Sequence, residues 1–184
     1  MDQARVNEFI VPTPWPAVND ALAGGLTRRR TSLVLSADAS TLARVADALV
    51  ASSRAVRLSF ATHQPAVACR WLAGPWLTAN RVRRAIDDTI VLTGCDLLVV
   101  DGLEWSALHS WQQIYHHAEA CRVLMACQPP TNQHVVVLWW DREPERSITG
   151  AGRFFDYVWT VKTTIGTRLS LHRSPEATVQ SFWL

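Results

Sequence analysis

The first stretch that could do chemistry is residues 31–50, TSLVLSADASTLARVADALV, in which an apolar run precedes a short polar turn and a helical pattern. A strand, a turn and a helix that begins with Ser40 and Thr41 form a layout that binds phosphate groups, because N–H groups at a helix N-terminus attract anions. The turn, however, holds no glycine and no lysine. The stretch therefore fits a nucleotide site, the remnant of one, or an ordinary strand-to-helix corner.

A working phosphate-binding loop has requirements that this turn does not meet. Its glycines let successive N–H groups converge on phosphate oxygens, and its lysine bridges the β- and γ-phosphates. The chain has no glycine between Gly25 and Gly74, and its single lysine, Lys162, is remote from the turn. Asp38 within the turn would repel a triphosphate. We therefore expect no conventional ATP hydrolysis, although a hydroxyl of the turn could still contact a metal ion.

A second candidate is Asp101, which follows the apolar run LLVV at 97–100. Ligands of open α/β sheets bind beyond the carboxyl ends of the strands, where an aspartate could hold a metal ion. An aspartate at this place also caps turns, so both interpretations stay open. His116, His117 and Cys121 suggest a further metal site, and the last two share one helix face, but no second pair supports them and structural zinc takes four ligands. We expect no metal centre.

Strands and helices alternate around these residues. Short apolar strands are predicted at 32–36, 55–60, 97–100, 123–127, 135–140 and 157–161, then at 167–172 and 178–183. Helical patterns lie at 40–52, 64–73, 79–93 and 106–120. Apolar strands separated by helices predict an α/β fold with a mainly parallel central sheet flanked by helices. The final strands lack intervening helices, which predicts antiparallel strands at the edge of that sheet.

The composition fits one globular domain: the chain has 184 residues, of which 48% are hydrophobic and 18% charged. We expect a leading segment at 1–30, an α/β core at 31–132 and a β-rich part at 133–184. The net charge of +2 neither requires nor excludes nucleic acid. The first residues lack a signal-peptide pattern, and no apolar stretch approaches the roughly 20 residues of a membrane span. This predicts a cytoplasmic protein without a membrane partner.

Four segments carry a resemblance through their order. They are TPWPAVNDALAGGL (13–26), LTANRVRRAIDDTIVLTGCDLLVVDGLEW (77–105), VLMACQ (123–128) and a closing pair, ITGAGRFFDYVWTV with LSLHRSPEATVQSFWL. In this order they resemble the C-terminal domain of DnaB-type replicative helicases, a branch of the RecA/RadA ATPases. The resemblance covers residues 13–184 and implies a RecA-like P-loop NTPase fold with a degenerate phosphate-binding loop.

The resemblance implies roles for individual residues. Asp101 falls on the Walker-B aspartate that helps to hold Mg²⁺, and Gln128 falls on a sensor glutamine that ends a strand. Arg173 falls on the arginine that reaches the nucleotide of a neighbouring subunit. Two positions depart from the family: Leu171 replaces a lysine of its basic pair, and Ala61 stands where it has a catalytic glutamate.

The segment RSITGAGRFF, residues 146–155, matches the position of a DNA-contacting loop in that family. Its glycines predict a mobile loop, Arg146 and Arg153 suit a DNA backbone, and Phe154 offers a stacking surface. The alternative is a plain hairpin connection whose Phe154 and Phe155 belong to the core. Candidate cofactor-binding residues are Ser40, Thr41 and Asp101.

The missing glycines and lysine of the phosphate-binding loop, with Ala61 in place of the catalytic glutamate, predict a non-catalytic pseudo-ATPase. The resemblance to DnaB-type helicases implies that it serves as an accessory protein in DNA replication, recombination or repair. It would bind an active RecA-fold ATPase, a helicase or a DNA polymerase, with DNA contact and homo-oligomer formation as further options. The nine tryptophans favour a protein interface, and we expect no cofactor. One alternative is a divergent Mg²⁺-dependent ATPase that uses Asp101, Gln128 and Thr41. The other is a single-strand DNA-binding module.

Overall fold

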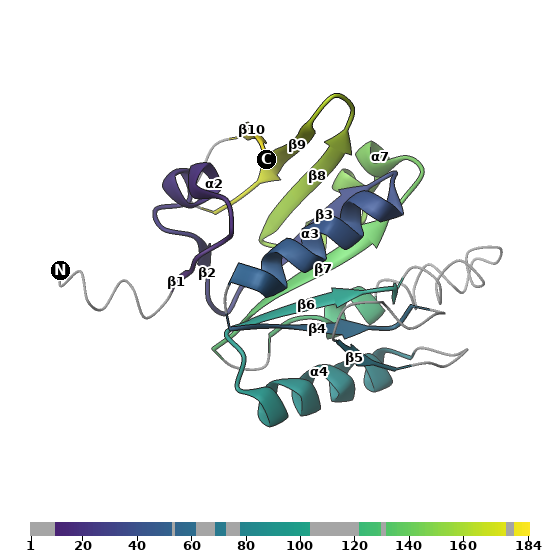
Figure 1. The fold of residues 1–184 in the computed structure, drawn as a ribbon. Helices are drawn as coiled ribbons and strands as arrows, with labels where there is room; N and C mark the ends of the chain where they lie inside the picture. Colours follow the sequence, from purple (N-terminus) through teal and green to yellow (C-terminus); the bar gives the residue numbers. More distant parts are fainter. Residues whose placement is uncertain are drawn as a thin grey trace.

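The computed structural model describes residues 10–52, 54–61, 69–72, 78–103, 122–129, 132–175 and 179–184 (Figure 1). The strands are β1 (Ile10–Val11), β2 (Leu26–Thr27), β3 (Thr31–Ser36), β4 (Ala55–Ser59), β5 (Arg70–Trp71), β6 (Leu97–Asp101), β7 (His134–Trp140), β8 (Tyr157–Thr163), β9 (Thr167–Arg173) and β10 (Gln180–Trp183). The helices are α2 (Pro16–Ala21), α3 (Ala39–Ser52), α4 (Ala79–Thr93), α7 (Pro144–Thr149) and the 3₁₀ turn η1 (Ala151–Phe154).

Eight strands form one sheet in the order β10-β9-β8-β3-β7-β6-β4-β5. The pairs from β8 through β5 are parallel, whereas β9 and β10 join in antiparallel pairs at the end of the sheet. A mainly parallel sheet with antiparallel C-terminal edge strands was expected from the sequence, and the structure confirms it. We call the edge at which the parallel strands begin the amino edge, and the edge at which they end the carboxyl edge.

Helices cover both faces of the sheet, and this is why every residue of β3 is buried. Leu33 and Leu35 of β3 pack in the same layer as α4, while Val34, which points to the other face, packs in the layer of α2 and α3. Figure 1 shows α3 lying across β3 and β7. The two layers explain why the strands are continuously apolar rather than alternating.

The helix predicted at 79–93 is α4, with those bounds. The Thr78 hydroxyl accepts a hydrogen bond from the N–H of Arg81, and Gly94 ends the helix in the left-handed conformation that favours glycine. Among the residues that the structure describes, no helix has the length and apolar character needed to cross a membrane.

The strand predicted at 123–127 is wrong, because residues 122–126 are helical. The Cys127 Sγ–H donates to the Val123 carbonyl one helical turn away, and Val123, Leu124 and Cys127 are buried in the layer of α4. A short apolar run suits a buried helix as well as a strand. The strands that lie beside β6 in the sheet are β4 and β7, and β7 is the strand that follows β6 among the described residues.

Three further expectations need correction or fall outside the described residues. The helix predicted at 64–73 is wrong where the structure describes it, since Arg70–Trp71 form β5. The loop or hairpin predicted at 146–155 is instead α7 followed by η1, which connect the parallel strands β7 and β8. The helix predicted at 106–120 lies outside the described residues.

Candidate functional site

The candidate site lies at the carboxyl edge, where β3, β4 and β6 end. Asp101 is the last residue of β6 and is in register with Ser59 of β4. β7 lies between β3 and β6, so the strand spacing separates the end of β6 from the turn after β3 by about 10 Å. The edge thus brings together Ser40, Thr41 and Asp101, the predicted cofactor-binding residues.

The turn between β3 and α3 is closed by the carboxylate of Asp38. It accepts hydrogen bonds from the N–H of Ser40 at 3.0 Å, from the Ser40 hydroxyl at 2.9 Å and from the Thr41 hydroxyl. The Thr41 hydroxyl, followed by the groups of Ser40, holds the pKa of Asp38 below its ordinary value. The chain's own carboxylate therefore occupies the helix N-terminus that would receive a phosphate group.

Thr41 is engaged on its remaining sides as well. Its Oγ1 atom lies 2.9 Å from the Thr163 hydroxyl of β8 and accepts a hydrogen bond from the Arg44 guanidinium at 3.1 Å. Thr41 as a whole is 1% exposed. A metal ion could reach this oxygen only after these contacts had been broken.

Asp101 is held by an arginine that reaches it from β4. The Arg57 Nε donates to Asp101 Oδ2 at 3.0 Å and Nη2 donates to the same oxygen, while Nη1 donates to Asp47 of α3 at 3.0 Å. The side chain of Arg57 is 7% exposed and that of Asp101 14%. A guanidinium therefore supplies positive charge at the carboxylate to which the resemblance assigns Mg²⁺.

A pocket of about 120 Å³ opens beside this ion pair. Its lining is Ala39, Leu42, Ala43, Arg57, Ala61, Asp101, Gly102 and Leu138. Gly102 has φ +78°, and a Cβ there would lie 2.2 Å from the backbone nitrogen of Ala61, so the chain passes here only as glycine. Asp101 Oδ1 is buried and has no hydrogen-bond partner among the residues that the structure describes. Asp101 thus keeps one unused acceptor that is shielded from solvent, and Ala61, which also lines the pocket, supplies no carboxylate to activate water.

Gln128 does not lie at this site. Its amide nitrogen donates to the carbonyl of Phe154 at 2.9 Å and lies 3.5 Å from the hydroxyl of Thr31, the first residue of β3. Gln128 is therefore at the amino edge, because the apolar run before it is a helix and not a strand. The strand between β3 and β6 is β7, and its carboxyl end, where a sensor residue was expected, carries Trp140 and then Asp141.

The remaining candidates are divided between the two edges. Arg173 ends β9 opposite Val158, near the start of β8, and is exposed at the amino edge. Arg153 also lies there, with its guanidinium 4.7 Å from the ring centre of Phe154, which packs against the core. Arg146 on α7 is exposed and paired with Glu143 at 2.6 Å. The three predicted DNA contacts therefore do not form one loop surface.

Arg57 and the capping role of Asp38 were missed in the sequence, although both left a signal. An arginine inside the buried run AVRLSF requires a charged partner. Asp38 stands directly before a helical pattern, where aspartate is a preferred N-cap. Among the described residues no group of three or more His, Cys, Asp or Glu side chains could hold a metal ion. His117 and Cys121 lie outside them.

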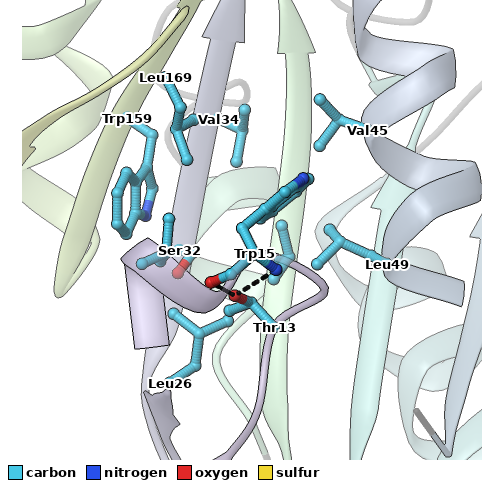
Figure 2. A pocket seen from close by; sticks show the side chains of 11 residues that line it. Thr13, Trp15, Leu26, Ser32, Val34, Val45, Leu49, Trp159 and Leu169 are labelled. Carbon is cyan, nitrogen blue, oxygen red and sulfur yellow. Dashed lines mark hydrogen bonds between the residues drawn. The ribbon is translucent and has the colours of Figure 1, made fainter. Parts of the chain in front are cut away.

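A second cavity lies under the N-terminal segment (Figure 2). Trp15 covers it between α3 and the sheet, and the Thr13 hydroxyl bonds to the Trp15 backbone. The space measures about 20 Å³ and its walls are almost entirely apolar. It has room for about one water molecule but lacks the polar partners that would hold one. This cavity is a packing defect and not a ligand site.

Comparison with known proteins identifies the fold. No model of a known protein family matches the sequence, and neither does any curated protein. Among solved structures, a KaiC-like protein from the hyperthermophilic archaeon Pyrococcus horikoshii OT3 superposes with a TM-score of 0.69. The alignment covers 95% of this chain and 93% of that one, at 9% sequence identity. At this identity the likeness concerns the fold alone, which is RecA-like, as the sequence predicted.

Proposed function

We propose that this chain is a pseudo-ATPase: a RecA-like protein without catalytic activity that acts as an accessory in DNA replication, recombination or repair. It works by binding a protein partner, an active RecA-fold ATPase, a helicase or a DNA polymerase. The observation that carries the loss of catalysis is the internal ion pair between Arg57 and Asp101.

Two charges of the chain itself support this proposal. Asp38 places a carboxylate at the N-terminus of α3, and Arg57 places a guanidinium against Asp101. A Mg²⁺-nucleotide would bring a like-charged group to each of these places. Binding would require the displacement of both, and the buried Arg57 would then have to find another partner for its charge.

The assignment to DNA metabolism rests on the four segments that resemble DnaB-type helicases in sequence and in order. In that comparison, the phosphate-binding loop of this chain is degenerate. Exposed apolar surface supports a protein partner: Trp183 on the edge strand β10 is exposed, and so are Leu184, which follows it, and Val179, which precedes the strand. Within the described part of the chain, Oδ1 of Asp101 has no hydrogen-bond partner, and this observation favours the alternative, a divergent Mg²⁺-dependent ATPase.

Nucleotide binding tests the loss of catalysis. The purified protein is titrated with labelled ATP and Mg²⁺, and phosphate release is followed in parallel. We expect neither binding nor release in the parent chain and in Asp101→Ala. ATP binding that depends on Mg²⁺ and disappears in Asp101→Ala, together with phosphate release, would overturn the proposal in favour of the enzyme.

Partner capture tests the accessory role. The tagged protein is used as bait in an extract of its native host, with the Trp183→Ser variant as the matched bait. We expect a RecA-fold ATPase, a helicase or a DNA polymerase to be retained by the parent chain, and less of it by the variant. Binding of the purified partner then gives the affinity. The absence of all three classes from the retained proteins contradicts the proposed role.

A further inference from the structure

The amino edge carries a row of arginines that the site at the carboxyl edge does not use. Six of them stand where the strands meet this edge: Arg28, Arg29, Arg30, Arg54, Arg153 and Arg173. They belong to segments that adjoin β4, β3, β8 and β9, so they spread across most of the sheet. Figure 1 shows that β3, β7, β6 and β4 begin on one side of the molecule.

Hydrogen bonds join much of this row into one surface. Arg28 pairs with Asp96 at 2.8 Å and donates to the carbonyl of Asn132, whose side chain accepts from Arg29 at 2.9 Å. Arg30 pairs with Asp156 at 2.8 Å. These contacts hold the segment before β3 against its neighbours on both sides.

The charge of this surface is not balanced. In the described part of the chain, Asp96 and Asp156 neutralise Arg28 and Arg30. The other four arginines are exposed and form no ion pair with any residue that the structure describes: Arg29, Arg54, Arg153 and Arg173. At the carboxyl edge, by contrast, carboxylates are interspersed with the basic groups, as in the set Asp38, Arg44, Arg57, Asp101 and Asp141.

The row has the length of a short stretch of nucleic acid. From β9 to β4 the sheet order counts five steps, which at about 4.8 Å each makes roughly 24 Å. One strand of a duplex advances about 3.4 Å per phosphate, so roughly seven nucleotides extend over this distance. Arginine suits phosphate because its planar guanidinium donates two parallel hydrogen bonds.

We propose that the amino edge binds the phosphate backbone of nucleic acid without reading its sequence. Arg173 contributes to this surface in its own chain rather than to the nucleotide of a neighbouring subunit, and Arg153 contributes without Arg146. The proposal does not depend on the loss of catalysis or on a protein partner, because the surface lies at the opposite edge from the pseudo-active site.

Fluorescence anisotropy measures the binding of labelled oligonucleotides of about 16 nucleotides, single-stranded and duplex, and so tests the proposal. Affinity is measured between about 50 and 200 mM salt. Four phosphate contacts predict a slope of log K against log salt of about −2.8 for a single strand and about −3.6 for a duplex. The form that binds more tightly identifies the natural source of the phosphates.

Two triple variants with the same change in net charge separate the surface from the charge of the whole chain. One replaces Arg29, Arg153 and Arg173 by alanine, and the control replaces the exposed Arg84, Arg142 and Arg168 by alanine. We expect the first to lose at least about tenfold in affinity and to reduce the slope by about 2 to 3, because each lost contact removes 0.7–0.9. The control should stay within about twofold of the parent.

Thermal melting of both triple variants shows whether they keep their structure. The charge reversal Arg54→Glu provides a second check, because the Arg54 side chain has no partner among the described residues that the substitution could remove. Arg54→Glu should weaken binding and leave the melting temperature unchanged. Three results overturn the proposal: no binding at low salt, equal effects of the two triple variants, or equally tight binding of polyglutamate, which would indicate an acidic protein segment as the ligand.

Discussion

Replacing Arg57 by methionine should be among the most destabilising single changes in this chain. The substitution keeps most of the buried volume but removes the guanidinium between Asp47 and Asp101. Asp101 is 14% exposed, so its carboxylate is left buried without a counter-charge, which costs about 3–5 kcal/mol. Asp47 is 42% exposed, and its pair contributes only about 0–1 kcal/mol.

Urea unfolding followed by tryptophan fluorescence measures these differences. Arg57→Met should lower the free energy of unfolding by about 3–5 kcal/mol, Asp47→Asn by less than about 1 kcal/mol. The double variant Arg57→Met/Asp101→Leu, which removes both buried charges, should recover most of the loss. If Arg57→Met costs no more than Asp47→Asn, Arg57 does not neutralise a buried carboxylate at Asp101, and this carboxylate is free to bind Mg²⁺.

Three other predictions concern the same scaffold. Asp38→Ala should lower the melting temperature by more at pH 7 than at pH 3. Because folding depresses the pKa of Asp38, its contribution is present above the ordinary value of 3.8 and is lost as the pH falls through the folded pKa. Gly102→Ala should cost more in urea unfolding than Gly94→Ala: both have positive φ, which costs about 1–2 kcal/mol in either, but only Gly102 has backbone atoms where the Cβ would lie. Cys127 should resist iodoacetamide at pH 8 until the protein unfolds, since burial raises the pKa of its thiol to about 12; mass spectrometry of the alkylated peptide decides this.

Helices and strands whose caps and apolar pattern lie within one stretch of sequence could be predicted from the sequence. The helix α4 has its cap, its apolar stripe and its terminal Gly94 within one stretch of sequence, and both of its ends were predicted correctly. The mainly parallel sheet follows from the continuous apolar strands, because only a sheet covered on both faces buries every residue of a strand such as β3.

The placement of Gln128 could not be predicted in the same way. Five apolar residues before it fit a buried helix end as well as a strand, and only the pairing of β6 with β7 across the sheet decides between them. The ion pair of Arg57 with Asp101 joins residues 44 positions apart. The buried arginine shows that a partner is needed, but not which of the acidic residues it is.

The order of the strands has a consequence for how the molecule meets its surroundings. Four arginines without an ion pair among the described residues lie at the edge where the parallel strands begin, whereas charges of both signs lie together at the edge where the strands end. Positive charge is therefore distributed unevenly along the strand direction. The electric field of an anionic polymer such as nucleic acid would orient the molecule during their approach, before any contact forms. The arginine side would arrive first, and the turn that begins with Asp38 would face outward, open to a second protein. Orientation of this kind weakens as salt is added, since the field extends only about 10 Å at 0.1 M ionic strength.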